Sequence, residues 1–150
     1  MQASNPSLFR PIDILLVEDN PGDRRLTIEA LKDGKVKNRI WEVEDGIQAL
    51  AFLRQEGEYS DVPRPDIIFL DLNMPGLDGR EVLAKIKVDE SLRRIPVMIL
   101  TTSDEESDVF TSYDLHANCY ITKPLELDAF FDAVKSIEHF WVSIVALPEN

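Results

Sequence analysis

Five polar side chains stand where short apolar runs of this sequence end: Glu18, Asp19, Asp71, Thr101 and Lys123. The runs before them are too short for helices and rich in Ile, Val, Leu and Phe, which predicts strands buried in a sheet. A charged group at the exit of a buried strand contributes little to packing. It must be solvated, paired, or used in chemistry.

The acidic members of this set suit a metal site. Two carboxylates about 4 Å apart repel by roughly 4 kcal/mol at an effective dielectric of 20, so a cluster of them favours a bound cation. Few, hard oxygen ligands with open positions suit Mg²⁺ (or Mn²⁺). We expect Asp19 and Asp71 to supply carboxylates and the backbone carbonyl of Asn73 to supply a third ligand. Glu18 would act through a water molecule.

A cation held there would also hold the oxygens of a phosphoryl group, and carboxylates do serve as phosphoryl-accepting nucleophiles. An oxygen of Asp71 would then be placed for in-line attack. Lys123 would neutralise one phosphoryl oxygen, and the hydroxyl of Thr101 would donate to another. The predicted product is an aspartyl phosphate on Asp71.

The elements that position these groups follow from the apolar pattern. Short apolar runs alternate with helical periodicity, which predicts an α/β protein built on a parallel sheet. The strands are expected at residues 12–17, 40–44, 67–71, 96–100 and 119–121. Right-handed crossovers and the more polar second strand favour a five-stranded, doubly wound sheet of order 2-1-3-4-5. Neighbouring strands lie roughly 4.8 Å apart, so Asp19 and Asp71 become neighbours, with Thr101 and Lys123 successively to one side.

Helices are expected between these strands. Asn20 is expected to cap one helix, with Pro21 at its first position, and Asp45 to cap the next. Asp78 with Glu81 forms a capping pair for a third helix, and Ser103 with Glu106 for a fourth. A last helix begins near Leu125. The residues expected to face inward from the helix after Asp45 are Ile47, Leu50, Ala51 and Leu53.

Composition narrows the class of protein. One hundred and fifty residues suit one domain (residues 12–138), which a polar arm (1–11) precedes and an apolar extension (139–150) follows. The formal charge of −12 argues against nucleic-acid and membrane partners. The single cysteine, Cys119, and the absence of a signal peptide or spanning segment indicate a cytoplasmic protein.

Four motifs together resemble the receiver domain of two-component response regulators. They are LVEDN (16–20), FLDLNMPG (69–76), LTTS (100–103) and YITKP (120–124). The resemblance covers about residues 12–138 and implies the flavodoxin-like receiver fold, with a cis peptide before Pro124. It also implies a switch in which Thr101 moves toward the phosphoryl group and Tyr120 swings into the vacated space.

Other segments are similar to the small response regulators of cyanobacterial phytochromes. They are DGIQAL (45–50), GREVL (79–83), YDLHANCY (113–120), and FW (140–141) with LP (147–148). This likeness implies a phytochrome histidine kinase as phosphodonor. Because the sequence contains neither a kinase nor an output domain, we expect its output to be a contact with a downstream protein of unknown identity.

The apolar extension admits two interpretations. Phe140, Trp141, Ile144 and Val145 share a helical face. They could cover their own domain or form a self-complementary patch that builds a two-fold homodimer. We favour the dimer.

Each site residue taken singly also has a purely structural explanation. Glu18 or Asp19 could be a helix cap, and Thr101 could provide a turn hydroxyl. Lys123 could be a surface lysine, and Tyr120 could be a half-buried core residue. These explanations do not account for why the groups converge. Two other functions also remain. A phosphatase acting through an aspartyl intermediate commonly has a second aspartate two residues after the nucleophile, where this sequence has Asn73. A phosphorylation-independent binding module would not need the acidic set.

Overall fold

The computed structural model describes residues 11–32, 37–72, 74, 76–101 and 119–122. Its centre is a five-stranded sheet of order β2-β1-β3-β4-β5 in which every neighbouring pair is parallel. The strands are β1 (Ile12–Val17), β2 (Asn38–Val43), β3 (Ile67–Asp71), β4 (Val97–Thr101) and β5 (Cys119–Thr122). The strand order and parallel arrangement predicted from the sequence are therefore confirmed.

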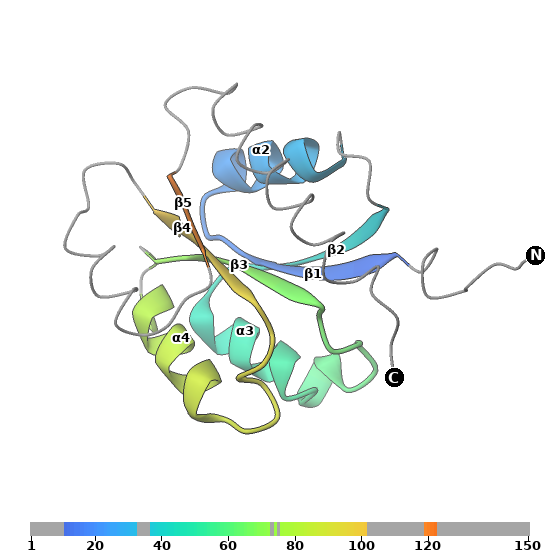
Figure 1. Cartoon of the computed structure of the whole chain (residues 1–150), viewed down its shortest axis with the longest axis vertical. Helices are drawn as coiled ribbons and strands as arrows, with labels where there is room; N and C mark the ends of the chain where they lie inside the picture. Colours follow the sequence, from blue (N-terminus) through green and yellow to red (C-terminus); the bar gives the residue numbers. More distant parts are fainter. Residues whose placement is uncertain (1–10, 33–36, 73, 75, 102–118, 123–150) are drawn as a thin grey trace, which may run out of the picture.

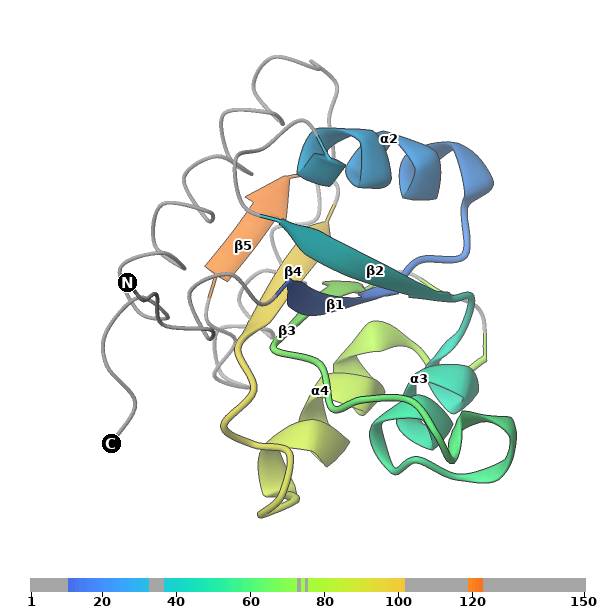
Figure 2. The same cartoon turned by 90° about the vertical axis from the view of Figure 1, so that its right-hand side faces the viewer.

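Helices cover both faces of this sheet. Helix α2 (Pro21–Lys32) lies on one face, and α3 (Gly46–Leu53) and α4 (Gly79–Val88) lie on the other (Figures 1 and 2). A short 3₁₀ helix, η1 (Gly57–Tyr59), follows α3. Among the described helices, none combines the length and the apolar character that crossing a membrane requires.

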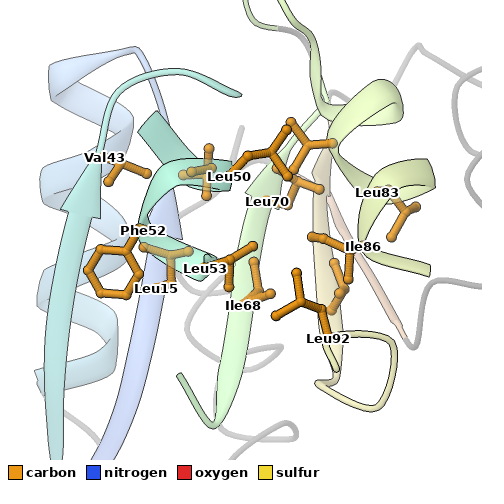
Figure 3. Packing of buried hydrophobic residues seen from close by; sticks show 14 of the residues in the cluster. Leu15, Val43, Leu50, Phe52, Leu53, Ile68, Leu70, Leu83, Ile86 and Leu92 are labelled. Atoms are coloured by element: carbon orange, nitrogen blue, oxygen red, sulfur yellow. The ribbon is translucent and has the colours of Figure 1, made fainter. Parts of the chain in front are cut away.

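The apolar runs of the sequence are explained by two hydrophobic cores, one on each face of the sheet. In β1, Leu15 and Val17 pack toward α3 and α4, whereas Ile14 and Leu16 pack toward α2. Because side chains alternate between the faces of a strand, a strand buried on both sides is apolar at nearly every position. Figure 3 shows the larger core, in which Leu15, Ile68 and Leu70 of the sheet lie against Leu50, Phe52, Leu53, Leu83 and Ile86.

The three predicted helix caps that fall on described residues are present, whereas Ser103 with Glu106 and the helix start near Leu125 lie outside those residues. The side chain of Asn20 accepts a hydrogen bond from Asp23 N at 2.9 Å, and that of Asp45 accepts one from Gln48 N at 2.8 Å. At the start of α4, Asp78 and Glu81 form a reciprocal capping box. These bonds satisfy backbone donors that a helix leaves unpaired at its amino end, and they explain where each helix begins.

One packing prediction for α3 is wrong. Ile47 was expected to face inward, but its side chain is 70% exposed. The buried face of α3 consists of Gly46, Ala49, Leu50, Phe52 and Leu53, and Ala51 is only partly buried. Gly46 lies so close to Leu77 and Val82 that a side chain there would clash with them. This close approach rotates α3 so that Gly46, rather than Ile47, faces α4.

Strand ends differ from prediction by one or two residues. β2 was predicted at 40–44 and begins instead at Asn38, because Asn38 pairs in register with Ile12 at the start of β1. β4 begins at Val97 and includes Thr101, one residue later than predicted at each end. Pairing with neighbouring strands, which a single segment does not reveal, sets these ends.

A polar cluster at the amino end of the sheet was not predicted. Asp13 is 3% exposed, and its carboxylate accepts hydrogen bonds from Arg39 Nε at 2.8 Å, Arg39 Nη2 at 3.0 Å and Trp41 Nε1 at 3.2 Å. Its backbone N–H donates to Asp66 Oδ2 at 2.9 Å. The cluster joins β1 and β2 to the segment before β3, at the end of the sheet opposite the predicted site.

Candidate metal and phosphoryl-acceptor site

Three carboxylates meet at the carboxyl ends of the two central strands. Glu18 and Asp19 follow β1 directly, and Asp71 is the last residue of β3. Val17 and Leu70 are register partners, which brings the residues after them to the same edge of the sheet. Each of the three side chains offers a carboxylate oxygen, and these oxygens all lie within 4.8 Å of one another. The convergence predicted from the sequence is confirmed for these three residues.

Burial makes this cluster different from a solvated acidic patch. Glu18 is 0% and Asp71 1% exposed, and Asp19 is partly buried. Neighbouring carboxylates taken out of water are costly unless positive charge compensates them. Clustered hard oxygen donors are the ligands preferred by small divalent cations. The residues present therefore fit a divalent metal ion.

The backbone of Glu18 is held at both of its polar groups. Its N–H donates to the carbonyl oxygen of Val43 in β2 at 3.1 Å. Its carbonyl oxygen accepts a hydrogen bond from Arg24 Nη1 in α2 at 2.8 Å. Its side-chain Oε2 accepts a further bond from Asn20 N at 3.2 Å. The first acidic residue is thus fixed to β2 and α2, and the backbone of Asp19 follows from that point.

Asp71 is positioned by β4 and by the start of α4. It is the register partner of Leu100, and Leu72 N donates to Leu100 O at 3.2 Å. Gly79 N donates to Leu72 O at 3.1 Å, so the first turn of α4 lies directly against the end of β3. This frame fixes the backbone that carries the Asp71 carboxylate.

The described backbone also locates two other predicted residues. Thr101 ends β4 one position beyond Leu100, and Tyr120 lies in β5 as the register partner of Ile99. Outside the described residues lie Asn73, Lys123, Pro124 and the whole apolar extension, including Phe140, Trp141, Ile144 and Val145. The metal ligand at Asn73, the ammonium group of Lys123, the cis peptide before Pro124 and the dimer patch therefore remain predictions.

Two residues that shape the site were missed by reasoning from the sequence. Arg24 has the appearance of an ordinary helix-surface arginine, and Gly79 that of a helix-start residue. The signals available were weak: Arg24 stands one helical turn after Asn20, and Gly79 occupies the position after the capping Asp78. Their contacts with the acidic strand ends are tertiary and leave no pattern in the sequence.

The fold and the acidic site together define a class of protein. Residues 14–135 match the response regulator receiver domain family, and the chain belongs to this family. Receiver domains carry a phosphoryl group on an aspartate and are phosphorylated by histidine kinases. The predicted flavodoxin-like receiver fold is thereby confirmed.

Similar proteins narrow the relationship further. Response regulator Rcp1 of Synechocystis sp. is 52% identical over 145 residues, which cover 97% of this chain and 96% of that protein. The crystal structure of the phosphorylated cyanobacterial phytochrome response regulator RcpA is 55% identical, with a TM-score of 0.84 over 93% of this chain and 100% of that one. The Mn²⁺-bound form of Rcp1 is 52% identical, with a TM-score of 0.82 and the same coverage. The chain is thus a response regulator related to those of cyanobacterial phytochromes, and binding of a divalent metal is in keeping with this relationship.

Proposed function

We propose that this response regulator accepts its phosphoryl group on Asp71, with Mg²⁺ (or Mn²⁺) bound beside it. The observation that carries the proposal is the meeting of Glu18, Asp19 and Asp71, with carboxylate oxygens within 4.8 Å of one another at the ends of β1 and β3. Asp19, Asp71 and the backbone carbonyl of Asn73 would bind the cation, and Glu18 would act through water. Asp71 is assigned as the acceptor for two reasons. It ends the central strand β3, and its side chain is more deeply buried than that of Asp19, the other carboxylate that would bind the metal.

The proposed transfer uses groups of this chain in defined roles. An oxygen of Asp71 forms a bond to phosphorus as the bond between phosphorus and the donor's histidine nitrogen breaks, and the electron pair of that bond stays on the nitrogen. When bound, the cation would supply positive charge to the phosphoryl oxygens. Lys123 would contribute an ammonium group and Thr101 a hydroxyl to the same oxygens.

Incubation with acetyl phosphate and Mg²⁺, followed by intact-mass measurement, tests this proposal. We expect one phosphoryl group per chain, lost on removal of Mg²⁺ and absent in Asp71→Asn. Asp61→Asn is the matched control, because it makes the same chemical change at an exposed loop position outside the acidic cluster. Labelling that persists in Asp71→Asn would refute the assignment.

The same experiment separates the two alternative functions. Continuous release of phosphate over many turnovers would indicate a phosphatase that works through an aspartyl intermediate. Absence of labelling in the wild-type chain would indicate a phosphorylation-independent binding module on a receiver scaffold.

A phytochrome histidine kinase is the proposed phosphodonor. The support is the likeness to Rcp1 and to RcpA, which is itself described as a cyanobacterial phytochrome response regulator. Transfer from an autophosphorylated cyanobacterial phytochrome should be faster than transfer from an unrelated histidine kinase at equal concentration. Equal rates from both kinases would contradict this choice of donor.

Output is proposed to pass through protein contacts controlled by Thr101 and Tyr120. Phosphorylation adds charge and acceptor oxygens near the end of β4, which would bias an existing two-state equilibrium. Thr101→Ala should leave phosphorylation nearly intact and weaken its effect on binding of a downstream protein. An undiminished effect would discard this route.

The domain boundaries and the dimer complete the proposal. The receiver would span residues 12–138, between an arm at 1–11 and an extension at 139–150 that joins two copies through Phe140, Trp141, Ile144 and Val145. The protein is proposed to act in the cytoplasm. Sedimentation of the full chain and of a chain ending at Glu138 tests the dimer: a full-length monomer, or a dimer that survives truncation, would exclude this role.

A further inference from the structure

Arg24 connects the acidic loop to the edge strand through two separate contacts. Its Nη1 donates to the carbonyl oxygen of Glu18 at 2.8 Å, and its Nε lies 3.3 Å from Glu42 Oε1. Its side chain is only 16% exposed, although it stands on a helix whose next residue, Arg25, has a side chain that is 82% exposed. Arg24 is therefore directed into the structure, toward the loop that carries the acids.

The two contacts fix a particular peptide group. The carbonyl that Arg24 binds belongs to the peptide bond between Glu18 and Asp19. The N–H of Glu18 is bound to Val43 O at 3.1 Å, so β2 supplies contacts through both of its last two residues, Glu42 and Val43. A guanidinium can hold two acceptors at once in a fixed planar geometry, which an ammonium cannot do.

We infer that Arg24 is a positioning residue for the divalent metal, acting by fixing the Glu18–Asp19 peptide and hence the direction of the Asp19 carboxylate. This inference rests on the proposed function, in which Asp19 is a metal ligand. Residues that orient metal ligands commonly change metal affinity by tenfold or more when removed. Glu42 supports this role by pairing with Nε of Arg24, whose Nη1 binds the Glu18 carbonyl.

The sign of the expected effect distinguishes positioning from charge. Arg24 is a cation close to an acidic site, so its charge alone disfavours a second cation there, and its removal would tighten metal binding. Loss of positioning weakens metal binding instead. The inference therefore predicts weaker binding in Arg24→Gln, against the direction that electrostatics alone would give.

Titration with Mn²⁺, followed through the electron paramagnetic resonance signal of the free ion, measures this affinity without any phosphoryl transfer. We expect Arg24→Gln to bind Mn²⁺ about tenfold more weakly than the wild type. Arg25→Gln is the matched control, because it removes the same charge one residue away from an exposed pair with Glu29. Its affinity should equal or slightly exceed that of the wild type.

Two further variants keep the test decisive. Arg24→Lys retains the charge and one contact, so its affinity should fall between those of Arg24→Gln and the wild type. Glu42→Ala leaves the Arg24 contact with Glu18 and should weaken Mn²⁺ binding less than Arg24→Gln does, whereas Glu29→Ala should not weaken it. Thermal unfolding establishes that each variant is folded. If Arg24→Gln does not fold, Arg24→Lys carries the test, because its charge is retained and weaker Mn²⁺ binding then reports lost positioning.

Unchanged or tighter Mn²⁺ binding in folded Arg24→Gln, or equal affinities of Glu42→Ala and Glu29→Ala, would overturn the inference while leaving the metal site intact. Failure of the wild-type chain to bind Mn²⁺ would instead overturn the proposed function on which the inference depends.

Discussion

Gly79 and Asp71 touch through their backbones at the junction of α4 and β3. A Cβ atom placed on Gly79 would overlap the carbonyl oxygen of Asp71 and lie 2.6 Å from the Cα of Leu72. Gly79 N also donates to Leu72 O at 3.1 Å. The first residue of α4 thus packs directly against the backbone of the proposed phosphoacceptor, at a position with no room for a side chain.

Gly79→Ala should destabilise the protein by about 2 kcal/mol, because the added methyl group forces backbone to move. Gly76→Ala, in the segment before α4, is a useful comparison. Gly76 has a φ of +77° but open space around its Cα, so its substitution should cost only about 1 kcal/mol through backbone strain. Urea denaturation measures both. A Gly79→Ala variant no less stable than Gly76→Ala would show that α4 shifts freely away from β3.

The orientation of α3 leads to a second stability prediction. Leu50 is 6% exposed and Ile47 70% exposed, so these two large apolar residues of α3 should respond differently to truncation. Leu50→Ala should cost about 3 kcal/mol through lost burial and a residual cavity. Ile47→Ala should change the free energy of unfolding by less than about 0.5 kcal/mol. Comparable losses in urea denaturation would show that Ile47 is buried in solution.

The Asp13 cluster should contribute to stability without affecting the site. Asp13→Ala removes the acceptor for Arg39 and for the Trp41 indole N–H, and should destabilise the protein by about 2 kcal/mol. Asp13 and Glu18 are five positions apart in sequence, which is roughly 16 Å along an extended strand. Mn²⁺ affinity should therefore stay within about twofold of the wild type, since charges at that distance are largely screened. A larger change in affinity would contradict the separation of the two clusters.

Asp89 should titrate at unusually low pH. Hydrogen bonds from the Ser91 hydroxyl at 2.7 Å and from Ser91 N at 2.8 Å stabilise its charged form and lower the pKa of the Asp89 carboxyl. A folded-state pKa below the unfolded value means that this group contributes stability above its ordinary pKa. That stability is lost as pH falls through the lowered pKa.

Carbon-detected NMR titration of the Asp89 carboxyl measures this shift. Ser91→Ala removes the hydroxyl donor and should move the pKa of Asp89 upward, toward its ordinary value. Ser60→Ala, at another exposed serine, should leave it unmoved. An Asp89 pKa that is the same in Ser91→Ala and the wild type would show that the hydroxyl bond does not persist in solution.

Much of this architecture could be predicted from local pattern. The runs before Glu18 and Asp71 are apolar at nearly every position because β1 and β3 lie between two cores. Asn20, Asp45 and Asp78 mark helix starts because their side chains accept hydrogen bonds from nearby backbone N–H groups in the same segment. Interactions of this kind join residues close in the chain, so the sequence displays both partners together.

Contacts between distant segments could not be predicted in this way. The exposure of Ile47 depends on how closely Gly46 approaches Leu77, and the role of Arg24 depends on Glu42 in a different element.

The sequence by itself determined the strand order, the helix starts and the meeting of three acids, because apolar periodicity and parallel pairing leave few alternatives. Only the tertiary structure decided the rotation of α3, the close seating of α4 on Asp71, and the choice of Arg24 over Arg25 to hold the acidic loop. Those outcomes depend on steric contact between surfaces, and shape complementarity is a property of the folded chain rather than of any one segment.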